Sequence, residues 1–204
     1  MSDKPAHSRD PEKHILQKYL RRGREDLVSK LDGLSEYDVR RPLVPSGTNL
    51  LGLVKHVASV QLDYFGAVFG RPSGMSLPWL ADDAEPEADM WATPEQSRAE
   101  ILDLHRLSAA HSDATIEELP LDAPGAVPWW DGERRNVTLQ QILVHMISET
   151  AQHAGHADIL RELIDGSLGR GSADPNVSAL SARARAAYAA RVDAAARVAG
   201  NLPA

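Results

Sequence analysis

Residues 138–166 read TLQQILVHMISETAQHAGHADILRELIDG, and this stretch decides the fold expected for the chain. Thr138 followed three residues later by Gln141 is typical of the capping box that begins a helix, and Asp165-Gly166 is typical of a helix end. Apolar residues recur at helical spacing between these two ends. The stretch therefore predicts one amphipathic helix over about 138–165.

The same helical spacing recurs in three earlier parts of the chain. It predicts a helix over about 11–32, a second over about 49–69, and a third that starts at a Thr93 cap, with Pro94 at its first position, and runs to about 118. Strand signals are weak throughout the sequence. Four amphipathic helices joined by loops predict an all-α protein, an antiparallel four-helix bundle.

The C-terminal part of the chain has a different composition. Residues 167–177 contain Gly, Ser, Asp and Pro and read as a linker, and the Ala- and Arg-rich stretch 177–199 predicts an additional C-terminal helix. We therefore expect a bundle domain over 1–166 and a linker with a helical extension over 167–204. Leu180, Tyr188 and Val192 recur at helical spacing, which suits packing against the bundle or against a second subunit, so we expect a possible homodimer.

Composition excludes several classes of function. The chain has 204 residues and no Cys, which rules out a disulfide framework, a thiolate nucleophile of its own, a Cys-type zinc site and an iron–sulfur cluster. The net charge of −7 disfavours a nucleic-acid partner. No apolar run is long enough for a membrane span, and the first residues lack an apolar signal core, so we expect a cytoplasmic protein.

The candidate metal-binding side chains cluster on the predicted helix 138–165. Its residues His145, Glu149, His153 and His156 fall within about 80° of the helix circumference, and they interrupt the apolar stripe instead of covering the solvent side. Removing an isolated carboxylate from water is costly, so a core-facing Glu149 needs a compensating cation. A divalent metal shared with His153, one turn away, would supply it.

A second helix would have to complete such a site. His56 lies between apolar residues on the stripe of the predicted helix 49–69, and it is the candidate from that helix. Two alternatives need no metal. A single His on an apolar stripe is often a hydrogen-bonded core residue, and Glu149 could pair with His145 or His156 on its own helix.

Two motifs carry a resemblance to a known family. Residues 50–56, LLGLVKH, resemble the second-helix motif of the DinB/YfiT-like superfamily, and residues 143–166 are similar to the fourth-helix signature of its DUF664 branch. The resemblance covers about residues 10–166. It implies a four-helix bundle that holds one divalent metal through His56, Glu149 and His153. Glu149 matches the branch similar to mycothiol-dependent maleylpyruvate isomerases.

The resemblance also implies an activity. Relatives are thiol-dependent S-transferases or isomerases, in which the metal activates a low-molecular-weight thiol cosubstrate for use on a small molecule, with no catalytic residue beyond the metal ligands. Nitrogen and carboxylate ligands suit Zn or Ni, with Fe or Mn as further possibilities. The loop residues Trp79, Trp91, Trp129 and Trp130 could line the mouth of the site. The alternative is a non-catalytic stress-related or small-ligand-binding bundle whose metal is structural or vestigial.

Overall fold

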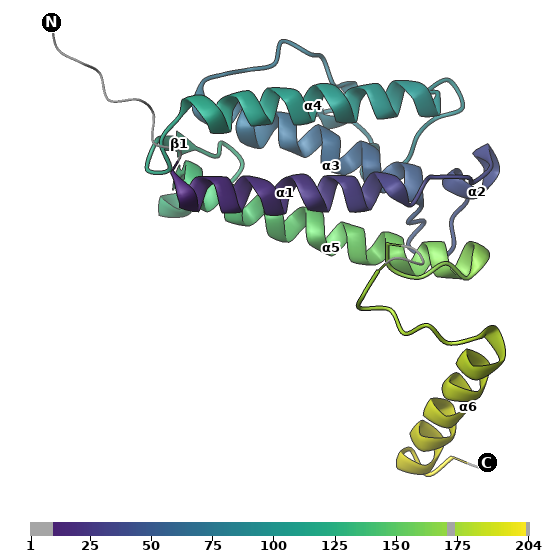
Figure 1. Cartoon of the computed structure of the whole chain (residues 1–204). Helices are drawn as coiled ribbons and strands as arrows, with labels where there is room; N and C mark the ends of the chain where they lie inside the picture. Colours follow the sequence, from purple (N-terminus) through teal and green to yellow (C-terminus); the bar gives the residue numbers. More distant parts are fainter. Residues whose placement is uncertain (1–9, 171–173, 203–204) are drawn as a thin grey trace, which may run out of the picture. The chain divides into compact units, whose positions relative to one another are not determined.

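A computed structural model describes residues 10–170 and 174–202. Its elements in chain order are α1 (Pro11–Ser29), α2 (Glu36–Arg40), α3 (Leu50–Phe65), the short 3-10 helices η1 (Ala67–Phe69) and η2 (Pro78–Leu80), α4 (Arg98–Glu118), β1 (Pro124–Ala126), the 3-10 helix η3 (Gly132–Arg135), β2 (Asn136–Thr138), α5 (Leu139–Asp165) and α6 (Ala182–Ala199). Four long helices lie side by side, which confirms the predicted all-α bundle with an additional helix (Figure 1). Within the described ranges, no helix has both the length and the apolar character of a membrane span.

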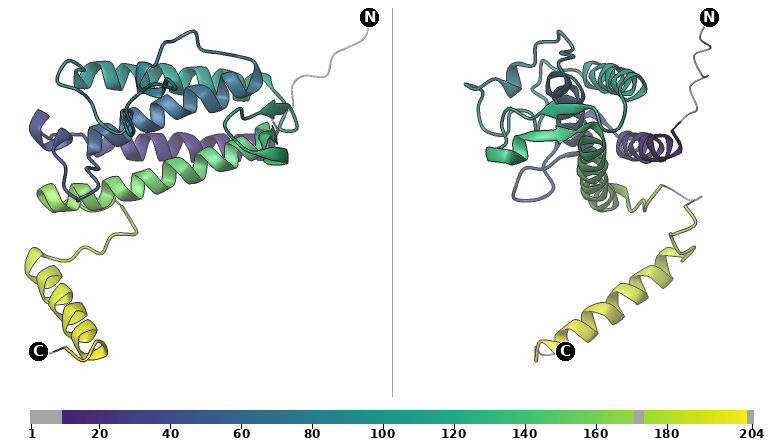
Figure 2. Two further views of the ribbon diagram at one scale, coloured as in Figure 1. Left: turned by 180° about the vertical axis from the view of Figure 1, so that it is seen from behind. Right: turned by 90° about the vertical axis from the view of Figure 1, so that its left-hand side faces the viewer.

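Helices α1 and α4 run in opposite directions. Lys13, at the start of α1, donates a hydrogen bond to the carbonyl oxygen of Leu119 just after α4 (2.7 Å), and Arg98, at the start of α4, donates one to the carbonyl oxygen of Leu34 beyond the end of α1 (2.9 Å). Helices α3 and α5 are likewise antiparallel (Figure 2).

Helices α3 and α4 run in the same direction because the long connection 66–97 returns the chain to the end of the bundle where α3 begins. Lys55, in the first half of α3, bonds the side chain of Gln96 just ahead of α4, and Arg71, beyond the end of α3, bonds Thr115 near the end of α4. The bundle is therefore antiparallel across two of its sides and parallel across the other two. This connection also carries residues to the face of α3 that matters below.

The ends of α5 are those expected from the sequence. The Thr138 hydroxyl accepts the N–H of Gln141 and the Gln141 side chain accepts the N–H of Thr138, which completes a capping box. At the other end Gly166 has φ 77°, a left-handed conformation that glycine adopts without steric cost.

The predicted start of the third helix is wrong by about one turn. Helix α4 begins after Ser97, whose hydroxyl accepts the N–H of Glu100 while the Glu100 carboxylate accepts the N–H of Ser97. Thr93 instead precedes a turn in which the Gln96 side chain accepts the Thr93 N–H at 3.0 Å. Two capping signals stand four residues apart in the sequence, and the reciprocal Ser97–Glu100 box begins the helix.

Three further elements are short. Strands β1 and β2 pair antiparallel, with Pro124 opposite Thr138, and α2 begins at a Ser35 cap. Each strand has three residues, too few for a period-two pattern in the sequence. The second strand leads directly into α5 and so adds a backbone anchor at the start of that helix.

Helix α3 lies deepest in the bundle. It packs most extensively against α4 and also against α5, and residues on nearly all of its sides are buried. A helix that is apolar all round belongs in the interior of a protein. Polar residues on such a helix are therefore the ones that require explanation, and Lys55, His56 and Gln61 are among them.

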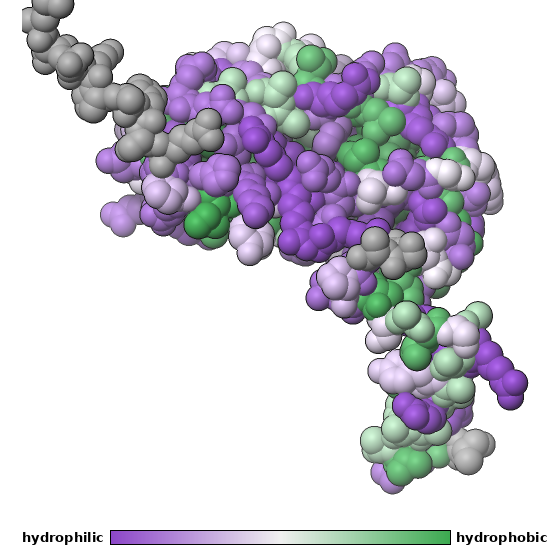
Figure 3. Space-filling view, viewed as in Figure 1, coloured by the Kyte–Doolittle hydropathy of each residue, from purple (hydrophilic) through white to green (hydrophobic). Residues whose placement is uncertain are grey.

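The chain divides after Ser167 into two compact units, of which the first holds the bundle. In the second unit α6 begins after a Ser181 cap, later than the predicted position 177, and none of its described residues is buried. Val192 and Val198 leave 51% and 78% of their surface exposed, and apolar residues are visible at the surface of this helix (Figure 3).

Candidate metal centre

Three side chains predicted from the sequence to hold a metal lie together between α3 and α5. His56 comes from α3, and Glu149 and His153 come from successive turns of α5. A carboxylate oxygen of Glu149 lies 3.3 Å from Nε2 of His56 and 3.0 Å from Nε2 of His153. The three ligand atoms all fall within 4.8 Å of one another. Among the described residues this is the group that could hold a metal ion.

The three side chains are partly buried. Their exposed fractions are 17% for His56, 27% for Glu149 and 12% for His153. The two imidazole rings meet edge to face, with centroids 4.8 Å apart. A site of this kind is shielded enough to strengthen electrostatic interactions and still open enough for a small ligand to reach it.

Asp89 is a further member of the site that the sequence does not identify. Its Oδ2 lies 2.6 Å from Nδ1 of His56, and its side chain is 16% exposed. Metal-binding histidines usually donate their second ring N–H to a carboxylate or carbonyl group, which orients the ring. Asp89 lies in an acidic loop with several other carboxylates, so no pattern in the sequence singles it out.

The loop that carries Asp89 is fixed to α3 by neighbouring residues. The Lys55 ammonium group, on a residue that is only 1% exposed, donates to the carbonyl oxygens of Ala88 and Trp91, both at 2.8 Å. A Cβ on Gly52 would lie 1.8 Å from the carbonyl oxygen of Met90, so only glycine permits this approach. Burial lowers the pKa of Lys55 to about 8, although Asp89 opposes the shift.

Hydrogen bonds and burial act on these groups in opposite directions. Burial lowers the pKa of His56, but its bonds to Asp89 and Glu149 outweigh that effect and leave the pKa raised. Burial raises the pKa of Glu149, and the two histidines outweigh it and leave the pKa lowered. Burial and the charge of His56 together lower the pKa of His153. The carboxylate of Glu149 is therefore favoured in its ionised form, the form that binds a cation.

The donor set fits a divalent metal. Two imidazole nitrogens and one carboxylate oxygen form a common zinc-binding set, which leaves a fourth position open. Ligand atoms that share a tetrahedral zinc ion at about 2.0–2.1 Å are separated by roughly 3.3 Å. The 3.0 and 3.3 Å separations about Glu149 are close to this value. Nδ1 of His56 is held by Asp89, whereas Nδ1 of His153 has no hydrogen-bond partner within the described part of the chain. Of the two histidines, only His56 is therefore oriented by a carboxylate other than Glu149.

The other two histidines of α5 lie outside this group. The His145 ring packs against Tyr64 and Trp130, with centroid separations of 4.8 and 5.2 Å. His156 packs against the ring of His153 at 5.5 Å. Neither hydrogen-bonds Glu149, so the alternative pairings with that carboxylate are not formed. Instead, Glu149 bonds His56 and His153.

The four tryptophans lie in two pairs, one beside Lys55 and one beside Tyr64. Trp79 donates to the Ser59 hydroxyl at 2.8 Å, and its ring lies 4.3 Å from the Lys55 ammonium, so it supports the Asp89 loop. Trp129 donates to the Tyr64 hydroxyl at 3.3 Å, and Trp130 packs beside the same tyrosine. Trp91, half exposed, contributes its carbonyl oxygen to Lys55.

Comparison with known proteins agrees with this architecture. A crystal structure of a conserved protein from Enterococcus faecalis has the same fold, with a TM-score of 0.59 and 21% identity over 76% of this chain and 97% of that one. No curated protein matches the chain. Residues 15–166 match the Mycothiol-S-transferase family. The matched range covers the bundle from the second turn of α1 to the end of α5. The chain therefore belongs to the Mycothiol-S-transferase family.

Proposed function

We propose that the protein is a divalent-metal-dependent S-transferase, or a related isomerase, that uses mycothiol or a similar low-molecular-weight thiol. His56, Glu149 and His153 are the proposed metal ligands. The observation that carries the proposal is the convergence of these three side chains on one point, with Glu149 within 3.3 Å of both histidines. The family match over residues 15–166 supports the thiol as the cosubstrate.

The residues of the chain would have distinct roles. When bound, a divalent ion supplies Lewis acidity, which lowers the pKa of a thiol so that the thiolate is available at neutral pH. Glu149 contributes the negative charge of the ligand set. Asp89 accepts a hydrogen bond from Nδ1–H of His56, which leaves Nε2 of that ring as the metal-facing atom. Because the chain has no Cys, the nucleophilic sulfur must come from a cosubstrate.

The proposed ligands narrow the choice of metal. Two histidines and a glutamate suit zinc or nickel, and iron or manganese bind similar sets. Three protein ligands leave room for a thiol or a water molecule. Metal availability during expression influences which ion is found, so metal content is measured on protein expressed with each of these ions supplied.

One experiment tests both metal and activity. The purified full chain is analysed for bound metal and then assayed for thiol consumption with mycothiol, with bacillithiol and with glutathione, using electrophilic acceptors and maleylpyruvate. Glu149→Gln removes the ligand charge and changes little volume, and His145→Ala is the matched control on the same helix. We expect turnover in the control and none in Glu149→Gln. A metallated protein that consumes none of the three thiols would instead indicate the non-catalytic bundle.

A further inference from the structure

Helix α3 is partly exposed along a single line of residues. Thirteen of its sixteen residues are buried, and the three that are not are His56, Val60 and Asp63. Residues three and four positions apart lie on the same side of a helix, so these three form one stripe, which we call the α3 stripe. It begins at a proposed metal ligand and runs toward the C-terminal end of the helix.

Asp63 ends the α3 stripe with a carboxylate that has no partner. No hydrogen bond or ion pair joins its side chain to another described residue, whereas Asp89 and Glu149, the carboxylates that contact His56, are both hydrogen-bonded. Burial raises the pKa of Asp63, and no charge or donor in the described ranges opposes the shift. A half-buried carboxylate without a donor is destabilising, so a ligand that brings a donor gains a strong interaction.

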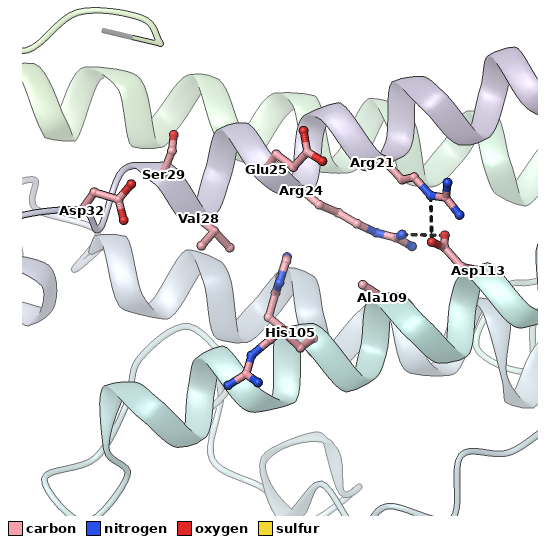
Figure 4. A pocket seen from close by; sticks show the side chains of 10 residues that line it. Arg21, Arg24, Glu25, Val28, Ser29, Asp32, His105, Ala109 and Asp113 are labelled. Atoms are coloured by element: carbon pink, nitrogen blue, oxygen red, sulfur yellow. Dashed lines mark hydrogen bonds and ion pairs between the residues drawn. The ribbon is translucent and has the colours of Figure 1, made fainter.

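The hollow between α1 and α4 offers no comparable preference (Figure 4). It has a volume of about 510 Å³. Its lining contains three arginines and three carboxylates, whose charges cancel: Arg21, Arg24, Arg106, Glu25, Asp32 and Asp113. Two of the arginines already bond the same carboxylate. Asp63 has no such counter-charge, so it favours a ligand with hydrogen-bond donors.

The length of the α3 stripe sets the length of a ligand. Asp63 follows His56 by seven residues, which corresponds to about 10.5 Å along the helix axis. Val60 lies between them and offers only apolar surface. A thiol whose sulfur lies at the metal centre therefore meets Asp63 with the far end of its body, roughly 10 Å from the sulfur.

Aromatic rings lie beside the α3 stripe. Ser59, one turn before Asp63, accepts a hydrogen bond from the indole of Trp79 at 2.8 Å, which places that ring on one side of the stripe. Tyr64, the residue after Asp63, packs edge to face against Trp129, half of whose surface is exposed. Flat aromatic surfaces pack against the C–H groups of sugar rings, and the hydroxyl groups of those rings supply donors that a carboxylate accepts.

The three thiols named above differ in the groups that they bring to Asp63. Glutathione and bacillithiol carry carboxylates, whereas the body of mycothiol consists of two linked, polyhydroxylated rings without a carboxylate. Like charges repel more strongly in a half-buried site than in water. Asp63 therefore disfavours the first two thiols and accepts hydrogen bonds from the third.

We propose that Asp63 selects the thiol cosubstrate, by accepting hydrogen bonds from the hydroxyl groups of an uncharged, sugar-like body and by repelling thiols that carry carboxylates. The inference rests on the proposed function, because it takes the thiol sulfur to lie at His56, Glu149 and His153. Asp63 is distinct from these ligands and takes no part in activating the sulfur.

The test measures the binding of two unreactive thioethers, S-methylmycothiol and S-methylglutathione, to the full chain by titration calorimetry. Asp63→Asn removes the charge at nearly constant volume, and Asp32→Asn, at an exposed position, is the matched control. We expect Asp63→Asn to weaken S-methylmycothiol binding on the order of tenfold, the ratio that one charge-assisted hydrogen bond supplies, and to strengthen S-methylglutathione binding. Asp32→Asn should change neither affinity. A general loss of structure would weaken both ligands, so opposite changes are specific to Asp63.

Turnover separates this inference from the proposed function. Binding of the thioethers requires no reaction, and their Asp63-dependent difference in affinity should persist in Glu149→Gln. If that difference is found in a protein that consumes no thiol, catalysis is refuted and the role of Asp63 in binding stands. Equal affinities of Asp63→Asn and Asp32→Asn for both thioethers would overturn the inference, even in an active enzyme. So would an absence of S-methylmycothiol binding at millimolar concentration, or weaker S-methylglutathione binding by Asp63→Asn, which would mean that Asp63 pairs with an ammonium group.

Discussion

Removing the carboxylate behind His56 should weaken metal binding without removing a ligand. Asp89 holds Nδ1 of His56 at 2.6 Å, and both side chains are only 16–17% exposed, so solvent screens the interaction incompletely. In Asp89→Ala the ring loses the group that fixes its orientation and its tautomer. Asp89→Asn keeps an acceptor and loses the charge, so its effect should be intermediate.

The expected loss follows from the position of Asp89. Outer carboxylates that orient a metal-binding histidine typically contribute about 10- to 100-fold in affinity, or roughly 1.4–2.7 kcal/mol. The short contact and the partial burial place Asp89→Ala toward the upper part of that range. The assay is competition between the protein and a chromophoric chelator for zinc at neutral pH, with the metal stoichiometry measured at saturation.

A matched control separates this effect from a general change in charge. Asp83 lies on the same loop and is exposed, so Asp83→Ala changes the net charge equally without contacting His56. Saturating metal should still give one ion per chain in every variant. A zinc affinity of Asp89→Ala equal to that of Asp83→Ala would refute the role assigned to Asp89.

Three further predictions concern the ligands, acid stability and the C-terminal unit. Alanine at any one proposed ligand should abolish stoichiometric metal while His145→Ala retains it, and a fully metallated His153→Ala protein by elemental analysis would contradict the ligand set. The pKa of His105 is about 4 in the folded chain, below its ordinary value of ~6.5, so below pH ~6.5 the folded state binds fewer protons than the unfolded state. The neutral buried ring therefore contributes stability above pH ~6.5, and this contribution is lost as pH falls toward 4. Between about pH 7 and about pH 5 the free energy of unfolding in urea should fall by roughly 2 kcal/mol more for the wild type than for His105→Gln. Equal falls in the two proteins would contradict the lowered pKa of His105. A chain of residues 1–168 should keep its metal, and a metal-free truncated chain would show that the bundle needs the C-terminal unit. Light scattering should find the full chain to be a dimer and the truncated chain to be a monomer. A monomeric full chain would exclude the dimer.

The sequence determined what depends on neighbours along the chain. The ends of α5 were predicted because a capping box and a C-terminal glycine act within a few residues. Glu149 and His153 share a face because residues four apart always do in a helix. The apolar stripe of the second helix, together with the family motif, identified His56 as the residue to meet them, and the structure brings the three together.

Tertiary structure decided what depends on distant segments. The parallel course of α3 and α4 follows from the long connection 66–97. Asp89 became part of the site because Lys55 and Gly52 hold its loop against α3. A local sequence pattern specifies which face of a helix is polar, but whether a polar atom on that face finds a partner depends on the packing of separate helices.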